Sequence, residues 1–283
     1  MKLSIRNVIL LFVSFLMMST SSLAEESYDY DAITTLDWQT GPKTQNILGK
    51  STIFVPEGFL FLNVKDTDKY LEMTNNQPLS TEELLIPEDF VWQAYFSFDD
   101  VGYIKDDEEI DADDLLKSAQ ETDKTSNKYR AEQGWSALTT VGWEYPPRYD
   151  RVSKRLEWAY ILKTEDTGEF QINYHTRVLG RNGVMGIQLA VFPEDLDRAV
   201  LELSNVLSSF EYNAGEKYKE YKKGDRVAEF GLAALIVGGA AAVASKKGLW
   251  AMLGALLIGA KKFAFAIIIA LFAGIASIFR RKK

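Results

Sequence analysis

The chain has 283 residues, no cysteine and a formal net charge of −8. All 40 acidic residues lie between Glu25 and Glu229, whereas ten of the 32 basic residues lie outside that range, so this region has a net charge of −18. This charge argues against nucleic-acid binding, because an acidic surface repels phosphate backbones. The lack of cysteine excludes disulfides and thiol chemistry.

The N-terminus has the three parts of a cleavable export signal. Lys2 and Arg6 supply positive charge, residues 8–18 are apolar, and Ser22-Leu23-Ala24 offers the small residues that a signal peptidase needs. The sequence therefore predicts a signal peptide over residues 1–24, with an uncleaved N-terminal anchor as the alternative. The lack of cysteine is compatible with an oxidising bacterial periplasm.

Residues 25–212 are expected to form one exported α+β domain. Its first half alternates apolar runs with turn residues, and strands are expected at residues 52–55, 59–64 and 91–98. Pro56-Glu57-Gly58 between the first two is typical of a tight turn. A helix should follow, which Asp111 can cap and Gly134 can end.

The second half predicts an antiparallel meander followed by a helix. The expected strands are residues 137–143, 156–163, 169–179 and 184–192. Asn182-Gly183 predicts a type I′ hairpin, which needs two positive φ angles. The helix after Pro193 has apolar residues at helical spacing and should cover the apolar face of the sheet. An antiparallel sheet packed with helices is therefore expected.

Residues 227–283 are expected to anchor the chain in a membrane, after a polar linker over residues 213–226. Three apolar stretches that end in basic residues are residues 227–245, 248–260 and 263–279. As helices, the first and third would be about 28 and 26 Å long, close to a hydrocarbon core of roughly 30 Å. Two spans are expected and a third stays open, because a cytoplasmic C-terminal basic cluster requires an odd number of crossings. These features predict an inner-membrane protein with its acidic domain in the periplasm.

Several short motifs resemble a known family. They are Trp38-Gln39-Thr40-Gly41-Pro42, Val55-Pro56-Glu57-Gly58-Phe59, Val101-Gly102-Tyr103-Ile104-Lys105-Asp106-Asp107, Gly142-Trp143 with Pro147-Arg148-Tyr149-Asp150, Leu156-Glu157-Trp158-Ala159, Asn173-Tyr174 and Leu179-Gly180-Arg181. In these motifs the chain resembles the predicted membrane-anchored bacterial proteins classed as domain of unknown function 2167. The resemblance implies location and architecture but no catalytic residue. The strand–turn–strand start and the final helix are also similar to the PsbP/Mog1-like α+β sandwich.

His175 is the only histidine, which leaves one candidate imidazole base and argues against a multi-histidine metal site. Strand alternation places Asn173 and Arg177 on the same face of the strand as His175. This polar patch could bind a small anion, and a solvated sheet face is the alternative. The chain has neither a Gly-x-Ser-x-Gly elbow nor a phosphate-binding glycine-rich loop.

An aromatic segment over residues 142–150 is the second candidate site. Its Pro146-Pro147 pair favours an extended loop between strands, along which the aromatic side chains could form a recognition surface. The candidate residues of this segment are Trp143, Tyr145, Arg148, Tyr149 and Asp150. Core packing of the aromatic rings is the alternative.

The acidic run over residues 106–114 raises the question of calcium binding. Asp111 and Asp113 stand at alternate positions, which suits a hard cation. The run departs from the EF-hand pattern, however, because its sixth position is not glycine and its twelfth is Lys117. A capped helix start is the favoured interpretation, and no metal or other cofactor is predicted.

The leading hypothesis is a non-enzymatic, membrane-anchored envelope protein whose exported domain binds a protein or peptide partner. The alternative is a small-ligand or metal-ion-binding domain with weak hydrolytic activity. If the domain ends by residue 212, a chain cut after Asp225 should remain folded and soluble.

Overall fold

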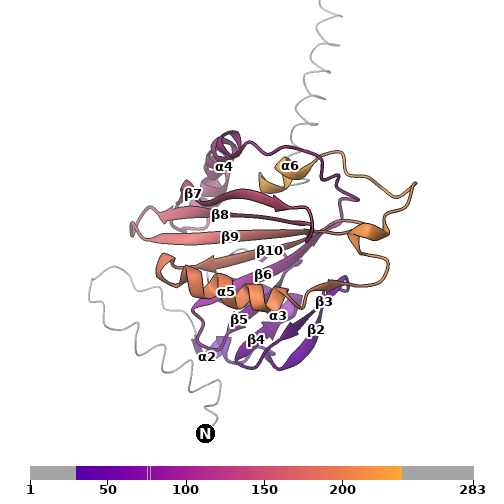
Figure 1. Cartoon of the computed structure of the whole chain (residues 1–283). Helices are drawn as coiled ribbons and strands as arrows, with labels where there is room; N and C mark the ends of the chain where they lie inside the picture. The colour runs from indigo at the N-terminus through magenta and orange to yellow at the C-terminus, as the bar shows by residue number, and fades with distance from the viewer. Residues whose placement is uncertain (1–29, 75, 77, 238–283) are drawn as a thin grey trace, which may run out of the picture. The chain divides into compact units, whose positions relative to one another are not determined.

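The fold is built on one large antiparallel sheet (Figure 1). The computed structural model describes residues 30–74, 76 and 78–237, so the predicted signal peptide and the tail from residue 238 lie outside the described residues. The strand order is β1-β4-β5-β6-β10-β9-β8-β7. These strands are β1 (Gln39–Thr40), β4 (Phe59–Leu62), β5 (Glu83–Pro87), β6 (Trp92–Asp99), β7 (Leu138–Asp150), β8 (Arg155–Thr164), β9 (Phe170–Leu179) and β10 (Val184–Val191).

A small three-stranded sheet of order β11-β3-β2 accompanies the large one. Its strands are β2 (Lys43–Ile47), β3 (Ser51–Val55) and β11 (Glu211–Tyr212). The α-helices are α2 (Tyr30–Ile33), α3 (Val64–Met73), α4 (Ala112–Glu132), α5 (Leu196–Leu207) and α6 (Leu232–Ile236), and the 3-10 helices are η1 (Pro193–Asp195) and η2 (Tyr218–Glu220). The prediction of an antiparallel sheet packed with helices is confirmed.

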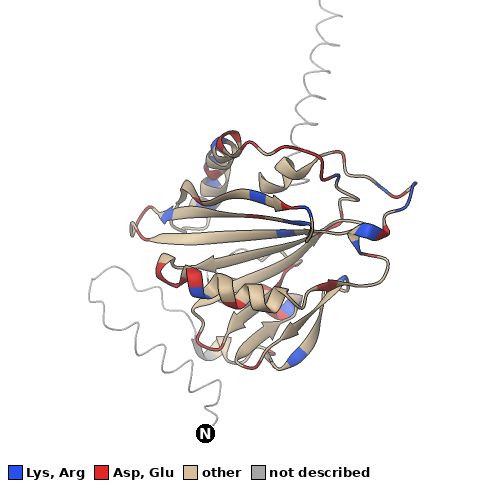
Figure 2. Cartoon of the chain, in the orientation of Figure 1, with Lys and Arg blue, Asp and Glu red and all other residues tan. Residues whose placement is uncertain are grey.

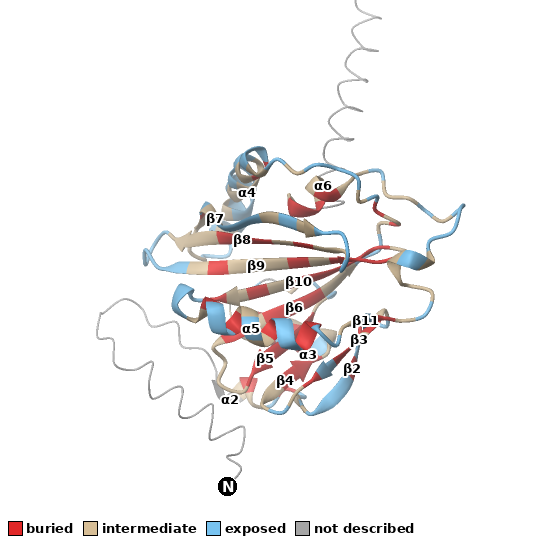
Figure 3. Ribbon diagram, in the orientation of Figure 1, coloured by how far each residue is buried: buried red, intermediate tan, exposed pale blue. Residues whose placement is uncertain are grey.

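One face of the large sheet is covered by a single hydrophobic cluster. Alternate residues of β6, β9 and β10 point to this face, where they pack against α5 and the small sheet. Trp92, Phe96 and Ile187 are among the residues that are fully buried there. In Figure 3, α5 lies in front of the sheet, and buried residues alternate with exposed ones along the helix.

The opposite face carries two separate clusters, one at each end of the sheet. At one end, α2 and α3 cover β4 and β5 through residues such as Tyr70 and Leu84. At the other end, α4 and α6 cover β8 through residues such as Leu115, Trp158 and Leu235. The middle strands β6, β10 and β9 therefore lie between two covered ends on this face.

Helix α4 also protects the outer edge of β7. The Asn127 side chain accepts from Leu138 N at 2.8 Å and donates to Leu138 O at 2.7 Å, and Asp123 accepts from Thr140 N at 2.7 Å. These side chains satisfy backbone groups that an edge strand would otherwise present to another strand. The predicted helix start is confirmed, because the Asp111 side chain accepts from Asp113 N and Asp114 N.

The turn between β9 and β10 differs from the predicted type I′ hairpin. Neither Asn182 nor Gly183 has a positive φ angle. The connection has four residues, and Gly180 N donates to Gly183 O at 2.8 Å. Glycine is needed at 183 for another reason, because a Cβ atom there would lie 2.1 Å from Asp99 O.

The segment predicted as a linker packs on the domain instead. Arg181 holds Asp225 through two hydrogen bonds of 2.7 and 2.8 Å, and Tyr103 stacks against Tyr218 with ring centroids 4.4 Å apart. Tyr103 also pairs with the following chain, since its N donates to Arg226 O and its O accepts from Ala228 N, both at 2.8 Å.

The compact unit extends to Val237, beyond the expected end at residue 212. Leu232, Leu235 and Ile236 of α6 are buried at 1–5% exposure in the cluster under α4. The first residues of the predicted tail thus fill the protein core, which needs apolar side chains as much as a bilayer does. In the part of the chain that the structure describes, no helix has the length and apolar character needed to span a membrane.

Glu83 on β5 is a buried carboxyl group whose side chain accepts from Leu48 N at 3.0 Å. Burial raises its pKa to about 7. The free energy of unfolding should therefore fall as the pH rises from about 4.5 through 7, because the folded state holds the proton more tightly. We expect Glu83→Gln to be more stable than the parent at pH 8 by roughly 3 kcal/mol, and equal to it near pH 4, as measured by urea unfolding. A constant difference across this range would contradict the prediction.

Candidate functional site

A set of polar side chains crosses the middle of the sheet on the face between the two hydrophobic clusters. It consists of Gln93 and Ser97 on β6, Gln188 on β10, and Asn173, His175 and Arg177 on β9. We call this set the polar strip. Antiparallel pairing aligns His175 with Gln188, and it aligns Arg177 with Gly186 and then Ser97. All six side chains are half-buried.

The charged residues gather mostly on helices and connecting segments, and the middle strands carry few of them (Figure 2). The strip is therefore built mainly from amide and hydroxyl groups. Ser97 and Gln188 make no side-chain hydrogen bond to any described residue. Asn173 Oδ1 and His175 Nδ1 are buried without a partner in the same part of the chain. Such unsatisfied groups are uncommon in native proteins and call for a specific explanation.

His175 packs between aromatic rings and is not on a solvated sheet face. Its ring stacks on Trp158 at a centroid distance of 4.9 Å and meets the Tyr160 ring at 5.8 Å with an interplanar angle of 78°. Burial and then the charge of Arg177 lower its pKa well below the usual range. The imidazole is therefore neutral at physiological pH, and it is a weak base.

The buried imidazole leads to a pH prediction. Because the pKa of His175 is lower in the folded than in the unfolded chain, the unfolded chain binds more protons, and stability should decline as the pH falls below about 6.5. In His175→Gln this part of the pH dependence should vanish, as measured by urea unfolding between pH 7.5 and 5. NMR should show a neutral ring at pH 5.5, and a titration midpoint near 6.5 would contradict the assignment.

Arg177 is a guanidinium group with few protein partners. It lies over the Trp158 ring at 5.4 Å, and Nη1 donates to Thr176 O at the long distance of 3.5 Å. Burial lowers the pKa of Arg177. The negative charges of Asp99 and Glu82 act in the opposite direction and raise it. None of the described carboxylates forms an ion pair with it. This arrangement is unusual, because buried charges in proteins are normally paired.

The aromatic segment predicted as a loop is part of strand β7. It pairs with β8 through Asp150, with one register shift just before Gly142 and one on either side of Tyr145. Pro146 and Pro147 fit because β7 is an edge strand and irregular pairing leaves room for residues that cannot donate. The expectation of an extended loop between strands is therefore wrong.

Strand geometry also separates the candidate residues of this segment. Trp143 stacks on Tyr160 at 4.5 Å and donates to Ala112 O at 3.1 Å, and Tyr149 donates to Asp106 at 3.0 Å, so both support the layer that contains α4. Tyr145, Arg148 and Asp150 have their contacts elsewhere. Tyr145 meets Tyr174 at 6.2 Å, Arg148 pairs in register with Glu157, and Asp150 accepts from Val152 N and Ser153 Oγ in a turn.

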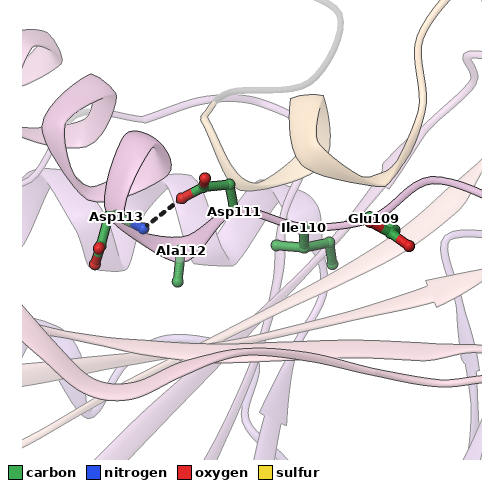
Figure 4. A pocket seen from close by; sticks show the side chains of 5 residues that line it. All are labelled: Glu109, Ile110, Asp111, Ala112 and Asp113. Carbon is green, nitrogen blue, oxygen red and sulfur yellow. Dashed lines mark hydrogen bonds between the residues drawn. The ribbon is translucent and has the colours of Figure 1, made fainter.

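The acidic run borders a depression of about 450 Å³ lined by residues 109–113 (Figure 4). The carboxylate of Asp111 turns back to accept from Asp113 N at 3.1 Å. Figure 4 shows Glu109 and Asp113 at opposite ends of this segment, so their carboxylates do not converge. Within residues 30–74, 76 and 78–237, no group of three or more acidic or histidine side chains could hold a metal ion.

A second depression of about 240 Å³ lies at the turn between β3 and β4, next to α5. Its charged side chains already have partners: Arg198 bonds Asp89 at 2.6 Å and Glu202 at 2.9 Å, and Trp92 donates to Glu202 at 2.8 Å. These contacts leave the depression with little spare capacity for a ligand.

The sequence therefore located half of the polar strip. Alternation along β9 gave Asn173, His175 and Arg177. It missed Gln93, Ser97 and Gln188, although alternation along β6 and β10 could have shown that they share a face within each strand. The missing information was that β10 lies between β6 and β9.

The fold defines the class as an α+β protein in which an antiparallel sheet is covered by helices and a small second sheet. The family model described as "Protein of unknown function (DUF2167)" matches residues 39–272, and the chain belongs to this family. None of the curated proteins matches the chain.

Two solved structures are similar to the chain at a low level. The solution structure of cyanobacterial PsbP from Synechocystis sp. PCC 6803 has 13% identity and a TM-score of 0.35, covering 70% of this chain and 99% of that one. The Saccharomyces cerevisiae Ran-binding protein Mog1p has 10% identity and a TM-score of 0.36, covering 61% and 96%. Both have the PsbP/Mog1-like names that the sequence analysis gave. Their similarity is too low to assign a function to this chain.

Proposed function

We propose that this chain is a membrane-anchored protein of the bacterial envelope. In this proposal the tail holds it in the inner membrane, the acidic domain lies in the periplasm, and the polar strip binds a protein or peptide partner. The observation that supports it best is the strip itself. A half-buried row of amide, hydroxyl and guanidinium groups has unused hydrogen-bonding capacity between two hydrophobic clusters.

Binding explains this arrangement better than stability does. Polar groups that are buried without partners cost about 1–3 kcal/mol each, so a sheet face without a function would gain from apolar residues at these positions. A partner that supplies hydrogen bonds would remove this cost. Catalysis is a poorer explanation, because burial lowers the pKa of the only imidazole and makes it a weak base, and its ring is stacked on Trp158 and buried at Nδ1.

A small-ligand function remains the second candidate because of Arg177. A guanidinium group without an ion-pair partner among the described residues can bind an anion of any size. This alternative uses the same surface, so the size of the ligand distinguishes the two functions.

The proposal can be tested by photo-crosslinking in intact cells. A benzophenone amino acid at Gln188 lies in the strip, and the same residue at Leu201, which is 64% exposed on α5, serves as the matched control on the opposite face. We expect a discrete crosslinked protein from position 188 that is absent from position 201. Equal products at both positions, or none at 188, would contradict a partner-binding strip.

The location needs its own measurement. We expect a mature protein that begins at Glu25 and sediments with inner membranes. Added protease should digest its domain in spheroplasts but not in intact cells. Mass spectrometry of the purified protein gives the N-terminus directly. A protein with Met1 retained would show that the signal is an uncleaved anchor, and protection from protease in spheroplasts would place the domain in the cytoplasm.

A further inference from the structure

Arg177 is the positive group of the polar strip, and its position follows from two neighbours. A Cβ atom at position 186 would lie 2.7 Å from Arg177 Nη1 and 2.8 Å from Ser97 Oγ. Glycine at 186 therefore provides the space in which the guanidinium group extends across β10 toward β6. The Trp158 ring supports it from the β8 side.

The hydroxyl group beside this guanidinium can still form hydrogen bonds. Ser97 Oγ has no hydrogen-bond partner among the residues described, and it lies on β6 next to the space that Gly186 leaves for the guanidinium group. A charged donor beside a neutral hydroxyl group is suited to an anion, because charge-assisted hydrogen bonds are about twice as strong as neutral ones.

From this geometry we infer that Arg177, with Ser97, binds a carboxylate group of the partner. This inference rests on the proposed function and specifies the chemistry that the strip recognises. The carboxylate is carried by the end or an acidic side chain of a peptide, or by a free small molecule, and the two sources are separated by the experiment below.

The surrounding charge favours a carboxylate over a phosphate. Glu82 and Asp99 interact with Arg177 from a distance, and the domain has a net charge of −18. A dianionic phosphate meets twice the repulsion of a monoanion in this field. A planar carboxylate also matches the fork of guanidinium donors, which a lysine could not reproduce.

The test uses the full chain in detergent micelles and isothermal titration with defined probes. Acetate is compared with acetamide, its neutral analogue of similar shape, and with inorganic phosphate. N-acetyl-trialanine is compared with its C-terminal amide. We expect both carboxylates to bind at least tenfold more tightly than their amides and more tightly than phosphate. Equal affinity of the acids and amides, or tighter binding of phosphate, would overturn the inference.

The variants connect this binding to the proposed residues. Arg177→Gln should abolish it and Arg177→Lys should weaken it at least tenfold, whereas Arg148→Gln, outside the strip on β7, should leave it unchanged. Ser97→Ala should weaken it several-fold in a protein whose fold is unaltered by circular dichroism, which guards against unfolding of the Arg177 variants. Parental affinity in both Arg177→Gln and Ser97→Ala would overturn the inference.

The source of the carboxylate follows from the same data. Tighter binding of N-acetyl-trialanine than of acetate supports a peptide, and equal affinity overturns the peptide form. If no carboxylate binds but the position-188 crosslink is recovered, the inference fails while the proposed function stands. If carboxylates bind and the crosslink is absent, the partner-binding function fails while the carboxylate site stands.

Discussion

A chain cut after Asp225 is expected to lose its cooperative fold, whereas a chain cut after Val237 should keep it. The shorter version lacks the pairing of Tyr103 with residues 226–228 and all of α6. Removing a buried leucine or isoleucine side chain costs about 2–5 kcal/mol, and α6 supplies three of them. The sum is comparable with the whole stability of a typical domain, about 5–15 kcal/mol.

Thermal unfolding of the two versions, both starting at Glu25 and followed by circular dichroism, provides the measurement. A matched pair of point variants isolates α6 within the full chain. Leu232→Ala removes a side chain that is 1% exposed and should cost about 3 kcal/mol, whereas Leu201→Ala removes one that is 64% exposed and should cost little. A sharp transition in the version that ends at Asp225 would show that the core is complete without α6.

Gly183→Ala is expected to be strongly destabilising, by about 3 kcal/mol. The new Cβ atom would lie 2.1 Å from Asp99 O and 2.9 Å from the Phe98 ring. Asp99 O belongs to the β6 backbone, so it cannot move away as a flexible side chain could. The hairpin would have to shift, and with it the pairing that aligns Arg177 with Gly186 and Ser97.

Gly142→Ala is the matched control for this substitution. Gly142 also lies beside a strand irregularity, but no atom lies within 4 Å of the position of its Cβ atom. The control should change the free energy of unfolding by less than about 0.5 kcal/mol. Urea unfolding compares the two variants, and equal stability would mean that the close approach of Gly183 to β6 is not present in solution.

The sequence predicted elements that have strong local signals. The apolar runs gave β3, β4 and β6, and Asp111 and Gly134 bracketed α4 correctly. It missed α3, because residues 64–73 contain few apolar side chains and the Asn63 cap was not recognised. It also missed β5, where Glu83 and Pro87 leave only three apolar residues between them.

The errors at the domain boundary and at the site have a different physical origin. Residues 232–236 have a composition that suits a bilayer and a protein core equally well, so hydropathy cannot distinguish the two. The Pro146-Pro147 pair was assigned to a loop because edge position and register shifts depend on tertiary pairing. The polar strip likewise depends on β6 pairing with a strand some 90 residues later in the chain.

The burial of α6 also has a mechanical consequence. Val237 is followed directly in the sequence by Gly238 and the rest of the apolar tail. In a protein anchored as proposed, tension on the tail would reach the core through Val237, which packs against the cluster under α4. It would first detach Ile236, whose carbonyl oxygen accepts from the Tyr160 hydroxyl at 3.4 Å, and then uncover the rings against which His175 packs. In that case strain on the tail would reach the face on which we propose that the partner binds.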